Sequence, residues 1–96
     1  MDVPYPIKRP GVDVVLTLEV FEEDGEVICG LRWLEGMIVI GGKSLFRAFV
    51  EELAEIEKRA KAAGCREIRH SGDLRSRLFP DYQPKPGLRN GLYKRL

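Results

Sequence analysis

A clear alternation of apolar and polar residues near the start of the chain does most to limit its fold. From Val12 to Phe21 apolar side chains recur at every second position, the pattern of a strand with one buried face. The following residues end in Asp24-Gly25, a pair that readily adopts the positive φ angles of a tight hairpin turn. The alternation resumes from Glu26 to Leu34, so this region predicts an antiparallel hairpin.

The next segment predicts a short buried strand and a long amphipathic helix. We expect a turn at Glu35-Gly36, followed by the continuous apolar run Met37 to Ile40, which predicts a strand buried on both faces. Ser44 is a suitable N-cap for the helix, and Gly64 is the expected C-cap. The predicted apolar stripe of this helix comprises Leu45, Phe49, Leu53, Ile56 and Ala60, and Phe46 and Val50 widen it. The solvent-facing side of this helix carries Glu51, Glu52 and Glu55. We interpret these glutamates as part of a solvated surface and not as a catalytic carboxylate cluster.

The two ends of the chain complete an α+β prediction. Cys65 to His70 predicts a fourth strand, and a short helix from about Leu74 to Phe79 is expected before Pro80. The segment 83–87 is expected to be a loop, and Leu88 to Leu96 a last strand. Residues 1–11 carry three prolines and predict an extended arm, which packs across the domain or against a neighbouring molecule. Residues 12–96 are expected to form a single domain. The predicted order is therefore β-β-β-α-β-α-β, with about five strands in an antiparallel or mixed sheet.

Composition fits one globular domain and excludes several classes of protein. The chain has 96 residues, of which 44% are hydrophobic and 32% charged, so disorder is not expected. No apolar run reaches the length of a membrane helix, and the N-terminus does not resemble a signal peptide, so we expect a cytoplasmic protein. Cys29 and Cys65 are interpreted as plain buried thiols, and with a single histidine no metal site is expected.

The charge of the chain is unevenly distributed. Residues 1–65 contain eight Lys or Arg and twelve Asp or Glu. Residues 66–96 contain eight Lys or Arg but only three Asp or Glu. The basic C-terminal third is most simply a solvated surface, but it could also bind nucleic acid or an acidic partner. The candidate residues for such binding are Arg66, Arg69, Arg75, Arg77, Arg89, Lys94 and Arg95.

Two local features deserve testing as chemical sites. Gly41-Gly42-Lys43-Ser44 resembles the end of a phosphate-binding loop, but Met37 stands where that motif requires its first glycine. We interpret the segment as a tight turn before a helix, although its glycines and the helix amides could hold a pyrophosphate. His70 is the only histidine, and with Asp73 as its sole evident support it is more simply a satisfied structural residue than a general base.

The region from Met37 onward resembles the GCN5-related N-acetyltransferase (GNAT) superfamily. Residues 62–69, Ala-Ala-Gly-Cys-Arg-Glu-Ile-Arg, are similar to that family's segment from helix end to strand. Residues 78–84, Leu-Phe-Pro-Asp-Tyr-Gln-Pro, resemble the region where the family writes Tyr-x-x-x-Gly-Phe, and residues 92–96 resemble a common family ending. By element order the resemblance covers residues 12–96.

The departures from the GNAT pattern limit what the resemblance implies about activity. The family binds acetyl-CoA at an Arg/Gln-x-x-Gly-x-Gly/Ala turn, whereas residues 40–45 have two glycines at a different spacing. In the family a tyrosine on the short helix acts as the general acid. Here Phe79 stands in its place, or Tyr82 takes this role from a displaced position. The family's first strand and two helices, which form much of the acceptor site, have no counterpart. Truncated members of this kind resemble small proteins of tailed bacteriophages.

Three functions follow as hypotheses. The first is a non-enzymatic binding or structural protein without a cofactor, such as a virion component or host-interaction protein, which associates with itself or with a protein partner. The second is a minimal N-acetyltransferase that binds acetyl-CoA through Gly41, Gly42, Lys43 and Ser44 and transfers protons through Tyr82 or His70. The third is a nucleic-acid-binding module that uses the basic C-terminal third.

Overall fold

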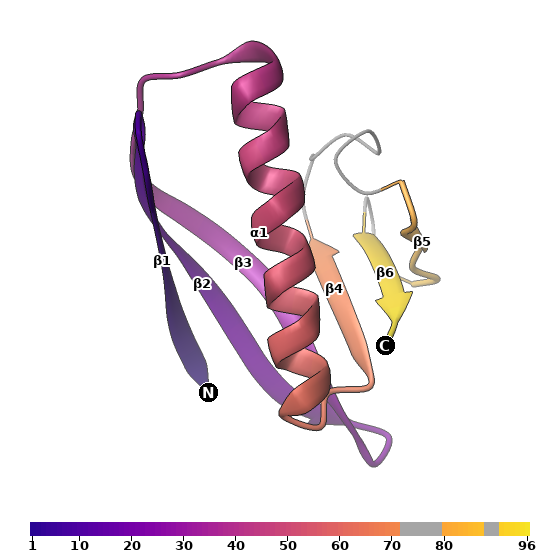
Figure 1. Cartoon of the computed structure of the whole chain (residues 1–96). Helices are drawn as coiled ribbons and strands as arrows, with labels where there is room; N and C mark the ends of the chain where they lie inside the picture. Colours follow the sequence, from indigo (N-terminus) through magenta and orange to yellow (C-terminus); the bar gives the residue numbers. More distant parts are fainter. Residues whose placement is uncertain (72–79, 88–90) are drawn as a thin grey trace.

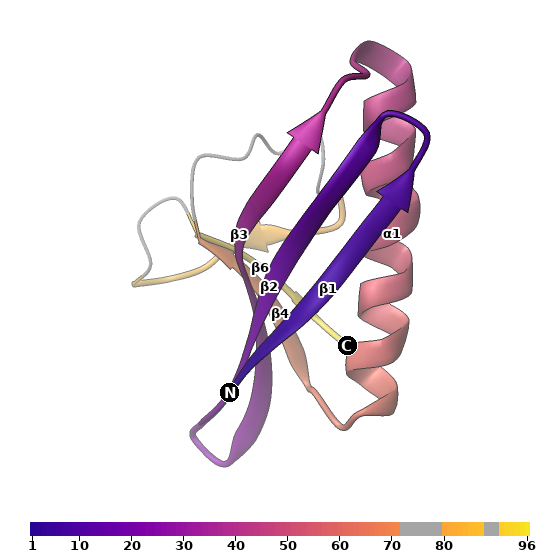
Figure 2. The ribbon, with the colours of Figure 1, turned by 90° about the vertical axis from the view of Figure 1, so that its left-hand side faces the viewer.

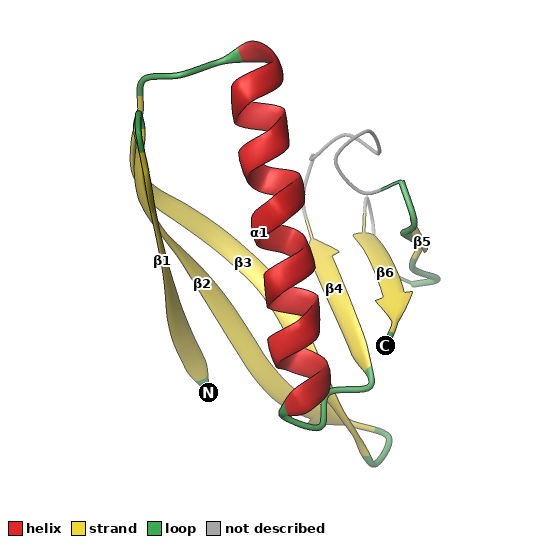
Figure 3. Ribbon diagram, viewed as in Figure 1, coloured by secondary structure: helices red, strands yellow, loops and turns green. Residues whose placement is uncertain are grey.

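A single mixed β-sheet with one long helix on one of its faces forms the molecule. The computed structural model describes residues 1–71, 80–87 and 91–96. Within these ranges there are six strands and one helix (Figures 1 and 3). The view in Figure 2 shows the helix running along the sheet as a second layer. The expected α+β class with a mixed sheet is therefore confirmed, with six described strands where about five were expected.

The strand order along the sheet differs from the order along the chain only at its C-terminal end. The order is β1-β2-β3-β4-β6-β5. Strands β3 and β4 are parallel and joined through the helix, whereas every other neighbouring pair is antiparallel. The elements are β1 Asp2–Arg9, β2 Val12–Glu23, β3 Glu26–Ile38, α1 Gly42–Ala62, β4 Glu67–Ser71, β5 Gln83–Pro84 and β6 Gly91–Arg95.

The first residues of the chain form a strand of the sheet. All of β1 pairs with β2, from Asp2 opposite Glu19 to Arg9 opposite Val12. The segment expected as an extended arm is thus extended, and it lies in the sheet as an edge strand, a pairing that the sequence analysis did not specify. Prolines are compatible with an edge strand because one side of its backbone needs no ladder partner.

The hairpin of β2 and β3 confirms the alternation and its turn. Asp24 and Gly25 have φ angles of 53° and 81°, as a tight hairpin turn requires. The turn expected at Glu35-Gly36 was wrong, because β3 continues through it to Ile38. Gly36 has φ 135°, and a Cβ at this position would overlap the carbonyl oxygen of Asp13. Glycine is thus needed here for close approach of two strands.

The apolar run at the end of β3 predicted burial on both faces, and this prediction was wrong. Met37 is 68% exposed and Val39 is 73% exposed, and Ile38 is 37% exposed. The short separate strand expected at Met37 to Ile40 is instead the last part of β3 and the connection to α1.

The core lies between α1 and one face of the sheet. Ile56 and Ala60 of the predicted helix stripe are buried, as is Ala48, and Leu45 and Leu53 pack against the core. Phe46 and Val50, expected to widen this stripe, are 44% and 40% exposed. The strands contribute mainly Tyr5, Ile7, Val12, Val14, Cys29, Leu31 and Ile68.

The ends of α1 differ in how well the sequence predicts them. Ser44 does not cap the helix, because the N-cap is Gly41, which makes no side-chain capping hydrogen bond. At the other end the C-cap is Ala63, and Gly64 follows with φ 94°. A left-handed glycine just after the C-cap is a common helix ending, so the predicted termination is confirmed to within one residue.

The C-terminal elements agree with the prediction where the structure describes them. β4 corresponds to the fourth strand, and β6 to the last strand. The loop expected at 83–87 includes the two-residue strand β5, which pairs with β6. The short helix predicted from Leu74 to Phe79, together with Asp73, lies outside the described residues.

Candidate functional site

The turn before α1 has open space around it and few polar partners. Gly41, Gly42, Lys43 and Ser44 are all exposed, and no described atom lies within 4 Å of a Cβ built on either glycine. Gly42 has φ 60°, so it adopts a conformation that favours glycine. The first turn contains no acidic residue and no side-chain cap, so its amide groups remain available to solvent or to an anion.

Tyr82 is placed in a buried hydrogen bond rather than at an open site. Its hydroxyl donates to Glu57 Oε2 of α1 at 2.9 Å, and Lys94 Nζ donates to Glu57 Oε1 at 3.0 Å. Burial, followed by the hydrogen bond to Glu57, raises the pKa of Tyr82 well above its usual value. The phenol is therefore held neutral as a donor that joins the helix to the C-terminal part of the sheet.

His70 is buried on the helix side of β4. It lies opposite Leu31 of β3 and Leu92 of β6, and it is 6% exposed. Burial lowers the pKa of His70, which favours the neutral imidazole. The two acid–base candidates of the sequence thus both lie in the interior.

The basic C-terminal candidates are largely engaged with carboxylates. Arg69 pairs with Glu67 and Glu23, and Lys94 pairs with Glu57. Arg95 pairs with Glu26 and Glu67, and Arg66 is exposed. Three of the four described candidates therefore have acidic partners within the chain. The other three, Arg75, Arg77 and Arg89, lie outside the described residues.

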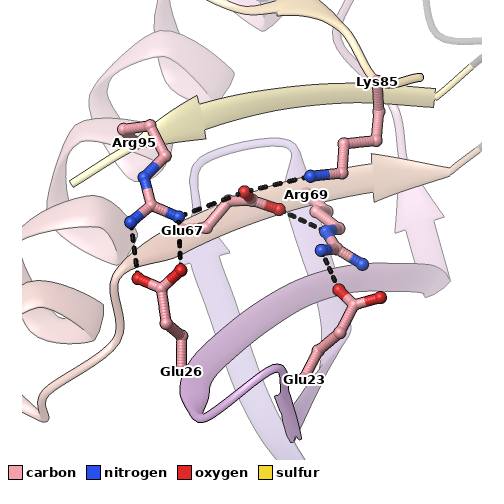
Figure 4. Close-up of polar contacts among 6 residues, drawn as sticks. All are labelled: Glu23, Glu26, Glu67, Arg69, Lys85 and Arg95. Atoms are coloured by element: carbon pink, nitrogen blue, oxygen red, sulfur yellow. Dashed lines mark hydrogen bonds and ion pairs between the residues drawn. The ribbon is translucent and has the colours of Figure 1, made fainter.

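A network of six charged residues lies on the sheet face opposite α1 (Figure 4). It comprises Glu23, Glu26, Glu67, Arg69, Lys85 and Arg95. Ile68 of β4 belongs to the helix-side core, so its neighbours on the strand point to the other face. Glu67 is the centre of the network, and its side chain is 3% exposed. It accepts hydrogen bonds from Arg69, from Lys85 Nζ at 3.2 Å and from Arg95 Nη1 at 3.4 Å.

The electrostatics of this network are balanced. Glu23 and Glu26 supply the remaining negative charges, so three carboxylates face three cations. Burial alone would raise the pKa of Glu67, but the hydrogen bonds from Arg69 and Lys85 outweigh burial and lower it. Two rings lie beneath the cations, with Arg69 Cζ 5.5 Å from the Phe21 centroid and Lys85 Nζ 4.7 Å from that of Tyr93. The arrangement is suited to stability, since its cations are already neutralised.

Six exposed apolar side chains belong to the segments where β3 leads into α1, and these segments lie at one end of the molecule (Figure 1). Each of the six is at least 36% exposed. We call this group the apolar end, and it comprises Leu34, Met37, Ile38, Val39, Phe46 and Val50. Exposed apolar surface of this kind commonly marks a site of interaction with another molecule. Sequence reasoning missed it, because an apolar run is equally the pattern of a buried strand.

Other kinds of site receive no support from the described part of the chain. Its histidine, cysteine and carboxylate side chains form no group that could hold a metal ion. Its single helix is not long and apolar enough to span a membrane. The thiols of Cys29 and Cys65 are free and buried, in agreement with the sequence interpretation.

Comparison with known proteins gives no assignment. No family model, no curated protein and no solved structure matches this chain. The function must therefore be inferred from the sequence and from the geometry of the described residues.

Proposed function

We propose that this chain is a non-enzymatic binding or structural protein on a reduced GNAT-like scaffold, and that the apolar end contacts a protein. The observation that carries the proposal is the exposure of six apolar side chains on the last part of β3, its connection to α1 and the first turns of α1. Burying such residues against a partner is favourable, at roughly 25 cal/mol per Å² of apolar surface. The resemblance to small phage proteins favours a virion component or host-interaction protein.

The placement of the acid–base candidates supports a non-enzymatic role. Tyr82 is buried and donates to Glu57, and His70 is buried on the helix side of the sheet. A general acid or base must reach the proton that it transfers. Neither side chain meets that condition in the described arrangement.

A minimal N-acetyltransferase is the second candidate, favoured by one specific observation. The parallel pair β3 and β4, joined through α1, supports this candidate, since the GNAT resemblance implies a strand, a long helix and a further strand in that order. The turn at Gly41 and Gly42 lies at the start of that helix, where amide groups without a cap favour an anion. Acetyl-CoA would be the cofactor in that case.

The basic residues give less support to a nucleic-acid-binding module. Binding to nucleic-acid phosphates needs protein cations that are free to displace the counterions of those phosphates. Arg69, Lys94 and Arg95 already pair with carboxylates of this chain. We therefore place this hypothesis third.

Titration calorimetry with acetyl-CoA distinguishes the first two candidates. Under the proposal, the whole chain shows no saturable heat with acetyl-CoA. Binding of one acetyl-CoA per chain that is lost in a Gly42→Asp variant would overturn the proposal and favour the acetyltransferase. A Gly25→Asp variant is the matched control, since Gly25 also has a positive φ and open space around it but lies in the β2–β3 turn.

A further inference from the structure

The acidic and the basic side chains of α1 are used differently in the fold. All four glutamates of the helix form ion pairs, three with cations of the sheet and one with Arg59 of the helix itself. Of the five Lys and Arg residues of α1, Arg59 alone has an ion pair in the described part of the chain. The other four, all exposed, are Lys43, Arg47, Lys58 and Lys61. Within the described residues, the folded helix therefore presents unpaired positive charge, although its acids and bases nearly balance in number.

These four cations lie on the side of α1 that points away from the sheet. A helix turns by about 100° per residue, so Arg47 and Lys58 lie about half a turn from the buried Ile56. By the same rule Lys43 and Lys61 lie about 140° from Ile56, and both are on the same outer side. Figures 1 and 2 show no described element over this side of the helix. The four side chains are therefore accessible to another molecule.

A row of exposed apolar side chains runs between the cations. Phe46, Val50 and Ala54 follow one another at intervals of four residues, so they are neighbours along the helix surface. Rows of this spacing interlock with the corresponding row of a second helix, and a small residue such as Ala54 allows the two helices to approach closely. We call the row and the cations together the outer ridge, which comprises Lys43, Phe46, Arg47, Val50, Ala54, Lys58 and Lys61.

The charge of the outer ridge indicates the chemistry of its occupant. From Lys43 to Lys61 the ridge is about 27 Å long, and it contains four cations and no carboxylate. Packing of two copies through this ridge would bring their cations together, which is unfavourable. A partner that carries carboxylates beside an apolar row is complementary to both features of the ridge.

Two other kinds of anionic partner fit the outer ridge less well. A nucleic-acid backbone would pair with the cations, but it offers no apolar surface to the row between them. A membrane-binding helix needs bulky apolar side chains along its length, whereas those of the ridge are confined to Phe46 and Val50 in its first half. The observations therefore favour a protein.

We propose that the outer ridge of α1 packs against an acidic amphipathic helix of another protein. The apolar side chains of that helix contact Phe46, Val50 and Ala54, and its carboxylates pair with the four cations of the ridge. This inference rests on the proposed function. It extends the contact from the apolar end, to which Phe46 and Val50 belong, along α1 and specifies the chemical class of the partner.

The test uses NMR of the whole ¹⁵N-labelled chain with two synthetic helical peptides of 21 residues, the length of α1. The first has a row of leucine and alanine flanked by glutamate, and the second replaces every glutamate with lysine. Both are cross-linked on the face opposite the row, so that they are helical before they bind. We expect saturable amide shifts at 43–61 with the first peptide only, because lysine opposes the charge of the ridge.

Matched variants test the assigned charges. A double variant, Arg47→Glu with Lys58→Glu, should weaken binding of the glutamate peptide by about tenfold, since each exposed charge contact contributes modestly. Lys8→Glu with Arg66→Glu makes the same charge change outside α1 and should change affinity by less than about twofold. All four substitutions are at exposed positions, so both variants should fold.

A further variant separates helix packing from attraction by charge alone. Ala54→Arg adds a cation to the ridge, but it places a long side chain where the partner helix must approach. It should weaken binding of the glutamate peptide by about tenfold. Ser44→Arg adds the same charge at an exposed position outside the apolar row and should not weaken binding.

Four results would overturn the inference. The first two are the absence of shifts at 43–61 with the glutamate peptide and equal binding of the lysine peptide. The third is tighter binding by the Ala54→Arg variant, which would reject helix packing. The fourth is tighter binding at the same amides of a DNA duplex or of phosphatidylserine vesicles, which would assign the ridge to phosphate groups. Failure here is distinguishable from failure of the proposed function, because the latter is measured by acetyl-CoA binding.

Discussion

Replacing the buried carboxylate of Glu67 tests whether the charged network stabilises the sheet. Glu67→Gln keeps the shape of the side chain and removes its charge. Three cations then lose a negative partner, of which Lys85 has no other carboxylate within ion-pair distance in the described residues. Arg69 and Arg95 keep Glu23 and Glu26.

The size of the effect follows from burial and from these remaining pairs. Breaking a fully buried ion pair on one side costs about 3–5 kcal/mol. The side chain of Glu67 is 3% exposed, but two of its three cations keep another carboxylate partner, so the loss is smaller than for an isolated buried pair. We therefore expect a loss of about 2–3 kcal/mol in the free energy of unfolding. For a domain of this size the melting temperature falls by roughly 10–20 °C.

Thermal and urea unfolding followed by circular dichroism measure this loss. Glu22→Gln is the matched control, since Glu22 is exposed on β2 and belongs to no ion pair in the described part of the chain. It should shift the melting temperature by less than about 3 °C. Equal melting temperatures for the two variants would refute the account of the network.

The dependence on pH gives a second readout of the same network. The pKa of Glu67 is lower in the folded protein than its ordinary value of 4.5. Its stabilising contribution is therefore complete above about pH 4.5 and is lost as pH falls through the lower folded value. The difference between wild type and Glu67→Gln should be constant near neutral pH and shrink below about pH 4.5. A difference that does not change in acid would contradict this linkage.

Two further predictions concern a backbone contact and the cysteines. Gly36→Ala should destabilise the protein by about 3 kcal/mol in urea unfolding, because its Cβ would overlap Asp13 in a left-handed conformation. Gly25→Ala, with open space around its Cβ, should cost about 1 kcal/mol, and equal losses would contradict the close-approach argument. Burial, followed by repulsion from Cys65, raises the pKa of Cys29 to about 11. A thiol reagent at pH 8 should therefore modify Cys29 slowly in native protein and rapidly in denaturant, and rapid native modification would refute its burial.

The hairpin and the helix could be predicted because local rules determine them. The alternation in β2 and β3 and the Asp24-Gly25 pair specify strands and turn without reference to the rest of the chain. The spacing of Leu45, Ile56 and Ala60 likewise specifies a helix with one buried face.

Other features depend on position in the sheet, and for that reason sequence patterns did not reveal them. Pro4 and Pro6 suggested an arm, yet Tyr5 and Ile7 alternate with polar or proline neighbours and are buried in β1. That alternation was the available signal, and an edge position makes the prolines compatible with it. The network around Glu67 gave no signal, since its partners come from separate strands that only the sheet order brings together.

The lengths of three elements explain why β4 pairs with only the first part of β3. β3 has 13 residues and spans about 43 Å at the rise of a strand, while β4 has five and spans about 17 Å. α1 has 21 residues, about 31 Å, and returns the chain along most of β3 before β4 begins at Glu67, opposite Ile28. A strand that starts there and is this short can pair with only the first part of β3. Among the described residues, β4 therefore has no pairing with the part of β3 that carries Leu34 and Ile38, a consequence of element length that no local pattern in the sequence reveals.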